Sequence, residues 1–94
     1  MPAVGLLTVD LHFPGARSLK DKRRILASVK DRVRKLNVSL AEIDHLDTHQ
    51  RARLGVVAVA AHRDHVDRVL EGVVVEMERR DPGLVLATDL QWLS

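Results

Sequence analysis

Residues 3–36 read AVGLLTVDLHFPGARSLKDKRRILASVKDRVRKL and decide the fold, because they hold a strand pattern followed at once by a helix pattern. The strand pattern covers 3–13, where aliphatic and β-branched residues dominate. It ends at Pro14-Gly15, a turn dipeptide in which Pro fixes φ and Gly tolerates the positive φ of a type II turn. The stretch therefore predicts a first strand over 3–13 and a sharp turn after it.

The helix pattern begins after this turn and predicts a helix over 18–36. Ser18 suits the N-cap position, and Asp21 follows three residues later as an acidic variant of the capping box. Apolar residues then recur at helical spacing, namely Leu19, Ile25, Leu26, Val29, Val33 and Leu36.

The rest of the chain adds three strand patterns and one helix pattern. The second helix is predicted between a cap at Asp64 and a stop at Pro82-Gly83. The alternation of the second strand slips between Leu40 and Ala41, which predicts a bulge or burial of both faces. The strands are predicted at 38–44, 53–61 and 84–92, the last with Leu84, Leu86, Leu90 and Trp92 on one face.

This order of elements matches the ferredoxin-like α+β sandwich, βαββαβ, in which two helices cover one face of a four-stranded antiparallel sheet. Ninety-four residues support one core, so a single domain over 1–94 is expected. On the first strand Leu7, Val9 and Leu11 would face the helices, and the other face of the sheet would stay open. Self-association through that open face is one expectation.

The composition sets the class of protein. With 46% hydrophobic and 30% charged residues, it is typical of a soluble globular domain. The absence of Cys excludes disulfides and thiolate metal sites. Because there is neither a signal-peptide pattern nor an apolar run long enough to cross a membrane, a cytoplasmic location without membrane insertion is expected.

Positive charge is concentrated in the first helix and the turn before it. Residues 17–35 hold nine basic residues and two acidic ones, although the whole chain has a formal net charge of only +2. On a helix of 100° per residue, most of these bases fall opposite the apolar side. The candidate nucleic-acid-binding residues, called the cationic face below, are Arg17, Lys20, Arg23, Arg24, Arg34 and Lys35.

A cationic stripe along a helix is typical of contacts to phosphates of nucleic acid. The alternative is a solvated face whose charges are used in pairs with acids of the second helix, Glu71, Glu76 and Glu78. Lys22 lies on the inner side of the first helix, where it must find a partner. Pairing with Asp10 is favoured over help in phosphate binding.

A second polar group is predicted at one end of the sheet, where carboxylates and imidazoles could hold a metal or transfer protons. The spacing of His45 and His49 suits zinc, but a loop does not enforce the geometry that a helix would. Ordinary salt bridges are the favoured interpretation, and His62 and His65 are expected to be capping or surface residues. The group comprises Asp10, His12, Glu42, Asp44, His45, Asp47, His49, Arg51 and Arg53.

No catalytic or cofactor-binding motif is present. The sequence lacks a P-loop, G-x-G-x-x-G, G-x-S-x-G and H-E-x-x-H, so neither an enzyme nor a cofactor is expected. Phe13 and Trp92 are the only aromatic residues, whereas sheet-face RNA readers need several rings. Any contact with RNA is therefore predicted to run through the basic helix to the phosphate backbone.

Residues 7–23, LTVDLHFPGARSLKDKR, look like the amino-terminal signature of the small bacterial YlxP-like proteins. The resemblance continues through VSLAE at 38–42 and LGV at 54–56, and it covers nearly the whole chain. It implies a ferredoxin-like fold and a link to translation and ribosome maturation. It brings no established catalytic residues.

The sequence thus favours a non-catalytic protein that binds structured RNA or a ribosomal particle through the cationic face. Two alternatives stay open. One is a protein-interaction module that uses the open sheet face, and the other is a metal-dependent enzyme centred on His45 and His49.

Overall fold

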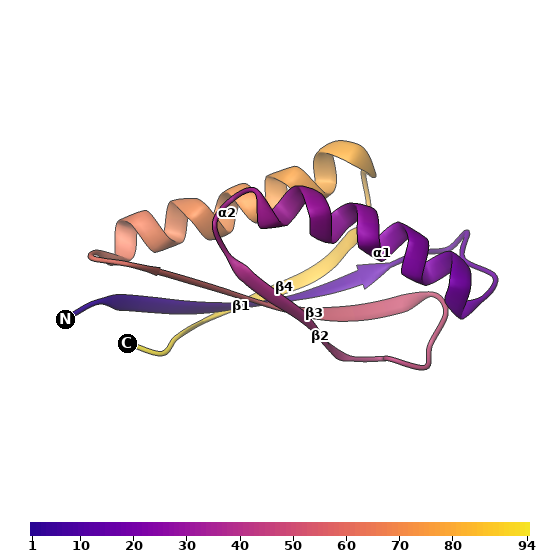
Figure 1. Cartoon of the computed structure of the whole chain (residues 1–94), viewed down its shortest axis with the longest axis horizontal. Coiled ribbons are helices and arrows are strands. Elements are labelled where there is room, and N and C mark those ends of the chain that lie inside the picture. The colour runs from indigo at the N-terminus through magenta and orange to yellow at the C-terminus, as the bar shows by residue number, and fades with distance from the viewer.

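One four-stranded antiparallel sheet carries both helices on the same face in the computed structural model, which describes residues 1–94 (Figure 1). The strand order is β2-β3-β1-β4, so β1 and β3 are central while β2 and β4 form the edges. This is the βαββαβ arrangement predicted from the sequence. Its elements are β1 (Ala3–His12), α1 (Leu19–Arg34), β2 (Ser39–Asp44), β3 (Arg51–Ala60), α2 (Arg63–Arg80) and β4 (Val85–Trp92).

The two helices begin differently. The Ser18 hydroxyl accepts a hydrogen bond from the amide of Asp21 at 3.0 Å, so the predicted cap of α1 is confirmed. The predicted cap of α2 is wrong. That helix begins at Arg63, two residues earlier than a cap at Asp64 implies. Asp64 thus lies in its first turn, where a carboxylate interacts favourably with the helix dipole. His62 takes the N-cap position, but its side chain makes no capping bond. Neither helix combines the length and the apolar character that a membrane crossing requires.

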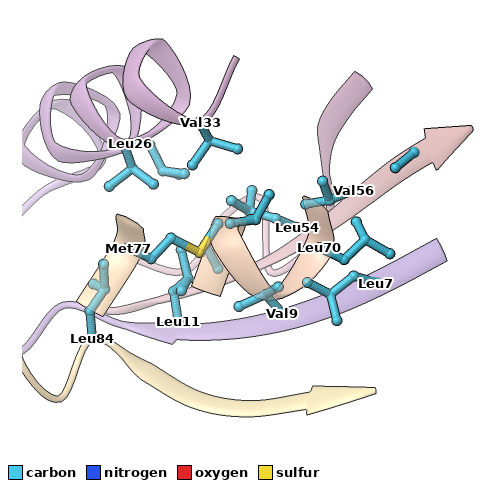
Figure 2. Packing of buried hydrophobic residues seen from close by; sticks show 14 of the residues in the cluster. Leu7, Val9, Leu11, Leu26, Val33, Leu54, Val56, Leu70, Met77 and Leu84 are labelled. Carbon is cyan, nitrogen blue, oxygen red and sulfur yellow. The ribbon is translucent and has the colours of Figure 1, made fainter. Parts of the chain in front are cut away.

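The core lies between the sheet and the helices, and it follows the alternation of β1. Residues of this strand are alternately buried and partly exposed along its whole length, as predicted from the sequence. Figure 2 shows the α2 side chains Leu70 and Met77 over the β1 side chains Leu7, Val9 and Leu11. Burial of each such side chain contributes about 1.5–3 kcal/mol relative to exposure.

Both edge strands contain an irregularity that the sequence pattern misplaced. In β2 the register shifts between Glu42 and Asp44, not at Leu40, and the residue left over is Ile43. In β4 a shift sets Val85 opposite Leu11 and leaves Leu86 out of the register. Leu86 is 50% exposed, whereas Leu84 is buried.

Close contact between α2 and the sheet depends on Gly5. A Cβ atom at this position would lie 2.9 Å from Cγ1 of Val66 and 3.2 Å from Cδ1 of Leu70. These distances are shorter than a van der Waals contact, so only glycine lets α2 approach this part of β1.

We expect Gly5→Ala to destabilise the protein by about 1–3 kcal/mol, because the added methyl group must push α2 away from β1. Urea unfolding followed by circular dichroism measures the effect. Gly72→Ala is the matched control. No atom lies within 4 Å of its Cβ position in α2, so helix propensity should stabilise that variant by up to about 1 kcal/mol. Equal stability of the two variants would contradict the steric argument.

Candidate functional site

The cationic face lies on the solvent side of α1 and on the turn before it. All six of its residues are exposed, while the buried side of the helix is formed by Lys22, Leu26, Val29 and Val33. Arg17 in the turn is held close to the helix start, since its amide donates to Oδ2 of Asp21 at 3.0 Å. The structure therefore brings all six predicted residues onto one solvent-facing region.

Few acidic groups neutralise this region. Arg34 alone among the six has an acidic partner, Asp31, at 3.6 Å on the exposed side of the helix. Such a pair contributes little in water.

Glu76 and Glu78 of α2 are engaged elsewhere. Glu76 lies 3.9 Å from Arg32 and 3.6 Å from Arg79, neither of which belongs to the cationic face. Glu78 accepts hydrogen bonds from the amides of Gly83 and Val85, and it thereby closes the turn into β4. The alternative interpretation required ion pairs between the cationic face and Glu71, Glu76 or Glu78. None of these acids forms such a pair.

A groove of about 560 Å³ lies beside Arg24, between the turn that precedes α1 and the turn that follows α2. Arg80 of α2 lines it too and donates a hydrogen bond to the hydroxyl of Ser28 on α1. Arg80 was not predicted from the sequence, because its proximity to α1 arises from helix packing across 52 residues of chain. Of the residues that line the groove, only the Pro-Gly turns at 14–15 and 82–83 were recognisable from the sequence, as turns.

Lys22 is the one base of α1 that is buried, with 2% of its surface exposed. Its Nζ atom lies 2.7 Å from Oε2 of Glu42 on β2 and donates a hydrogen bond of 2.6 Å to the carbonyl of His45. The contact with Glu42 is an ion pair, and the His45 carbonyl accepts a hydrogen bond from the same ammonium group. The predicted structural pairing is confirmed, but the predicted partner, Asp10, is wrong.

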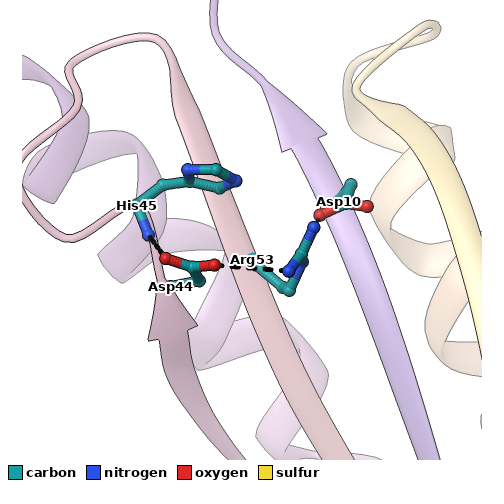
Figure 3. A network of polar contacts seen from close by, with 4 residues as sticks. All are labelled: Asp10, Asp44, His45 and Arg53. Atoms are coloured by element: carbon teal, nitrogen blue, oxygen red, sulfur yellow. Dashed lines mark hydrogen bonds and ion pairs between the residues drawn. The ribbon is translucent and has the colours of Figure 1, made fainter.

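Asp10 instead belongs to a chain of charges on the open face of the sheet (Figure 3). Nε of Arg53 donates to Oδ1 of Asp10 at 2.7 Å, and its Nη1 donates to Oδ2 of Asp44 at 3.3 Å. The other oxygen of Asp44 accepts the amide of His45 at 2.7 Å. That backbone hydrogen bond, with the nearby charges of His45 and Arg53, lowers the pKa of Asp44 below its ordinary value. The hydrogen bond to Asp10 raises the pKa of Arg53.

The predicted metal-binding or catalytic group at this end of the sheet does not assemble. Glu42 points to the helix side with Lys22, while Asp10 and Asp44 are held by Arg53 on the open face. His49 is exposed in the loop, and no three His, Asp or Glu side chains come together in a way that could hold a metal ion. The metal-dependent hypothesis centred on His45 and His49 therefore has no support in this arrangement. Of the group, Asp10, Glu42, Asp44 and Arg53 take part in salt bridges.

Removal of either partner of the buried ion pair should destabilise the protein. We expect Glu42→Ala to cost about 3 kcal/mol, because it leaves the Lys22 ammonium buried with one carbonyl partner. Lys22→Ala should cost a similar amount, because it leaves a carboxylate that is only 15% exposed. The double variant Lys22→Met, Glu42→Leu should recover most of the loss in urea unfolding. A double variant as unstable as the sum of the two single ones would show that the groups are not coupled.

The Asp44 network should make stability depend on pH in the acid range. Because the pKa of Asp44 is lower in the folded state, its contribution is present above the unfolded pKa of about 3.9 and disappears as the pH falls through the folded value. The melting temperature of Asp44→Asn should therefore fall less steeply with decreasing pH than that of the wild type below about pH 4. Asp47→Asn, which removes an exposed loop carboxylate, controls for the loss of one negative charge. Identical pH profiles for wild type and Asp44→Asn would contradict this assignment.

Comparison with known proteins places the chain in a family. Residues 4–90 match the family model described as "Protein of unknown function (DUF503)". The chain is 42% identical over 72 residues to the "Uncharacterized protein YlxP" of Bacillus subtilis (strain 168), an alignment that covers 76% of this chain and 78% of that protein. Its fold is similar to that of the "De novo designed protein Foldit4", with a TM-score of 0.61 at 10% identity, over 100% of this chain and 98% of the other. The chain belongs to the DUF503 family, and it is YlxP-like.

Proposed function

We propose that this protein is a non-catalytic, cytoplasmic protein that binds structured RNA or a ribonucleoprotein surface through the cationic face. One observation carries the proposal: six exposed basic residues share one face of α1 and its turn, and five of them have no acidic partner. Unpaired cations on a rigid helix release counterions when they neutralise phosphates, which is the main source of affinity for nucleic acid.

The burial of Lys22 strengthens this argument. The nine bases at 17–35 could make the helix cationic on all sides. Here the inward base, Lys22, forms an ion pair with Glu42. Arg32 is turned toward Glu76 of α2, and the six residues of the cationic face carry the charge that a partner can reach. The aligned positive charge therefore suits the regular spacing of phosphates along a nucleic-acid backbone.

The aromatic residues favour recognition of RNA shape over base reading. Phe13 is 3% exposed in the core, and Arg63 lies 4.8 Å above the ring of Trp92. Of the residues on the open face of the sheet, only His12 carries a ring, so this face lacks the several rings that base stacking requires. Double-stranded RNA is bound mostly by shape and by contacts to phosphates and 2′-hydroxyls, and the cationic face can make phosphate contacts of this kind.

A protein-interaction module is the second candidate. Val59 of β3 is 66% exposed and Ile43 of β2 is 51% exposed, and neither is covered by a helix. Apolar side chains on an open sheet face favour a protein partner over RNA. Added salt separates the two candidates, because phosphate binding weakens steeply with salt while an apolar interface does not.

The test measures binding to ribosomal RNA and ribosomal particles over a salt series. We expect a dissociation constant of about 1 µM or tighter near physiological salt for the wild type. Replacing four bases of the cationic face by Ala should weaken binding at least about tenfold and lower the salt slope by about one unit for each lost contact. Alanine keeps the helix intact. The four bases are Arg17, Lys20, Arg23 and Arg24.

A matched control removes the same charge from other elements. It replaces four exposed arginines outside α1 by Ala, and it should keep most of the affinity because those residues do not share the cationic face. If both variants bound equally, net charge and not the position of the bases would determine the affinity, which would contradict the proposed site. Absence of binding by the wild type would overturn the proposal. The control residues are Arg51, Arg63, Arg68 and Arg79.

A further inference from the structure

The edge strand β4 is the least covered element of the fold. α2 packs over β1 and β3, so the β4 residues that point to the helix side are left largely uncovered. Thr88 and Leu90 pair with the buried residues Val9 and Leu7, yet both are exposed. In Figure 2 the labelled core residues come from the helices, β1 and β3, and only Leu84, just before β4, joins them from that side. At β4 the core is therefore continued only by the partly buried Val85 and Trp92, near the two ends of the strand.

An apolar groove of about 500 Å³ follows this boundary between α2 and β4. Leu7 and Leu70 of the core line it, together with Val74 and Val75 of α2 and Leu90 of β4. The polar residues Asp67, Glu71 and Thr88 complete its lining. Val75 is 56% exposed and Leu90 is 37% exposed. Only 21 of the 94 residues are buried, so apolar surface that is continuous with the core remains uncovered here.

The outer edge of β4 is also open to strand pairing. Sheet edges are normally protected by lysine, proline, a bulge or a short strand. The other edge, β2, is six residues long with a bulge at Ile43. The strand β4 is eight residues long and contains no Lys or Pro. Its own bulge, at Leu86, lies near its start, so it pairs regularly with β1 from Ala87 to Trp92. Unpaired backbone groups along such a strand are a template for another strand.

The sequence of β4 indicates which strand would fit. Leu86-Ala87-Thr88-Asp89-Leu90 has a leucine two residues on either side of Thr88. If two copies pair antiparallel about Thr88, each Leu86 lies opposite the partner's Leu90. Each Asp89 then lies opposite the partner's Ala87, so the only charged residues of the two strands do not face each other. This complementarity of a strand with itself points to a second copy of this chain and not to an unrelated peptide.

We propose that the protein forms a twofold dimer in which two β4 strands pair antiparallel, with Thr88 on the axis, to make one continuous eight-stranded sheet. The leucines of each copy then cover the groove beside α2 of the other. A twofold contact of this kind is closed, so it protects the edge without leading to fibres. The dimer does not depend on the proposed RNA binding, and it uses a different surface from the open sheet face.

The absence of cysteine makes a direct test available. Residues directly opposite in an antiparallel pair have Cα atoms about 4.5–5.5 Å apart, which is within reach of a disulfide. We expect Thr88→Cys to form a covalent dimer under mild oxidation, seen on non-reducing gels. Leu90→Cys is the matched control on the same strand. Its partner position would be Leu86, so the two thiols introduced by this control lie too far apart to cross-link. Equal cross-linking of the two variants, or none with Thr88→Cys, would overturn the proposed register.

Sedimentation equilibrium of the purified protein between about 1 and 200 µM tests the dimer without cross-linking. We expect the wild type to be dimeric and Leu90→Lys to be monomeric with an unchanged circular dichroism spectrum, because Leu90 is already partly exposed. Val59→Lys on the open sheet face should stay dimeric. A monomeric wild type would overturn the proposal, and so would dissociation by Val59→Lys but not by Leu90→Lys.

Discussion

The ion pair between Lys22 and Glu42 sets the position of α1, and the surface chemistry of the protein depends on that position. An ammonium group that is 2% exposed requires a partner, and only the carboxylate on β2 and the His45 carbonyl are within reach. These contacts fix both the height of the first helical turn above the sheet and its rotation about its own axis. With Lys22 turned inward and Arg32 turned toward Glu76 of α2, the bases of the cationic face lie on the solvent side of α1.

The position of α2 leaves the other edge of the sheet, β4, largely uncovered. Gly5 allows α2 to lie close to β1, where Val66 and Leu70 take the space that a side chain would fill. A single helix in that place covers β1 and β3 but cannot also cover β4. The fold therefore exposes two different surfaces, a cationic one on α1 and an apolar one along β4. Both follow from where the helices are anchored.

The strength of the local signal explains how much could be predicted. The order of elements, the Ser18 cap and the alternation of β1 are encoded by neighbouring residues, and the structure confirms them. The burial of Lys22 followed from helix periodicity, but its partner did not, because Asp10 and Glu42 are both plausible until the faces of their strands are known. The same limit applies to Arg80 and to the bulge beside Leu86, which arise from packing between distant segments. The exposed side of α1 was predictable because it depends on one helix alone.

Pairing through β4 would change what the cationic face can do. In the strand order β2-β3-β1-β4, α1 is anchored to β2, which lies at the edge opposite β4. A dimer about β4 therefore leaves both cationic faces uncovered, at the two ends of one continuous sheet and on its same side. A partner that presents phosphates to both faces at once would bind with an effective concentration far above that of a single contact. Short RNA duplexes cannot span both ends, so a dimer would favour large folded RNAs over short helices without reading any base.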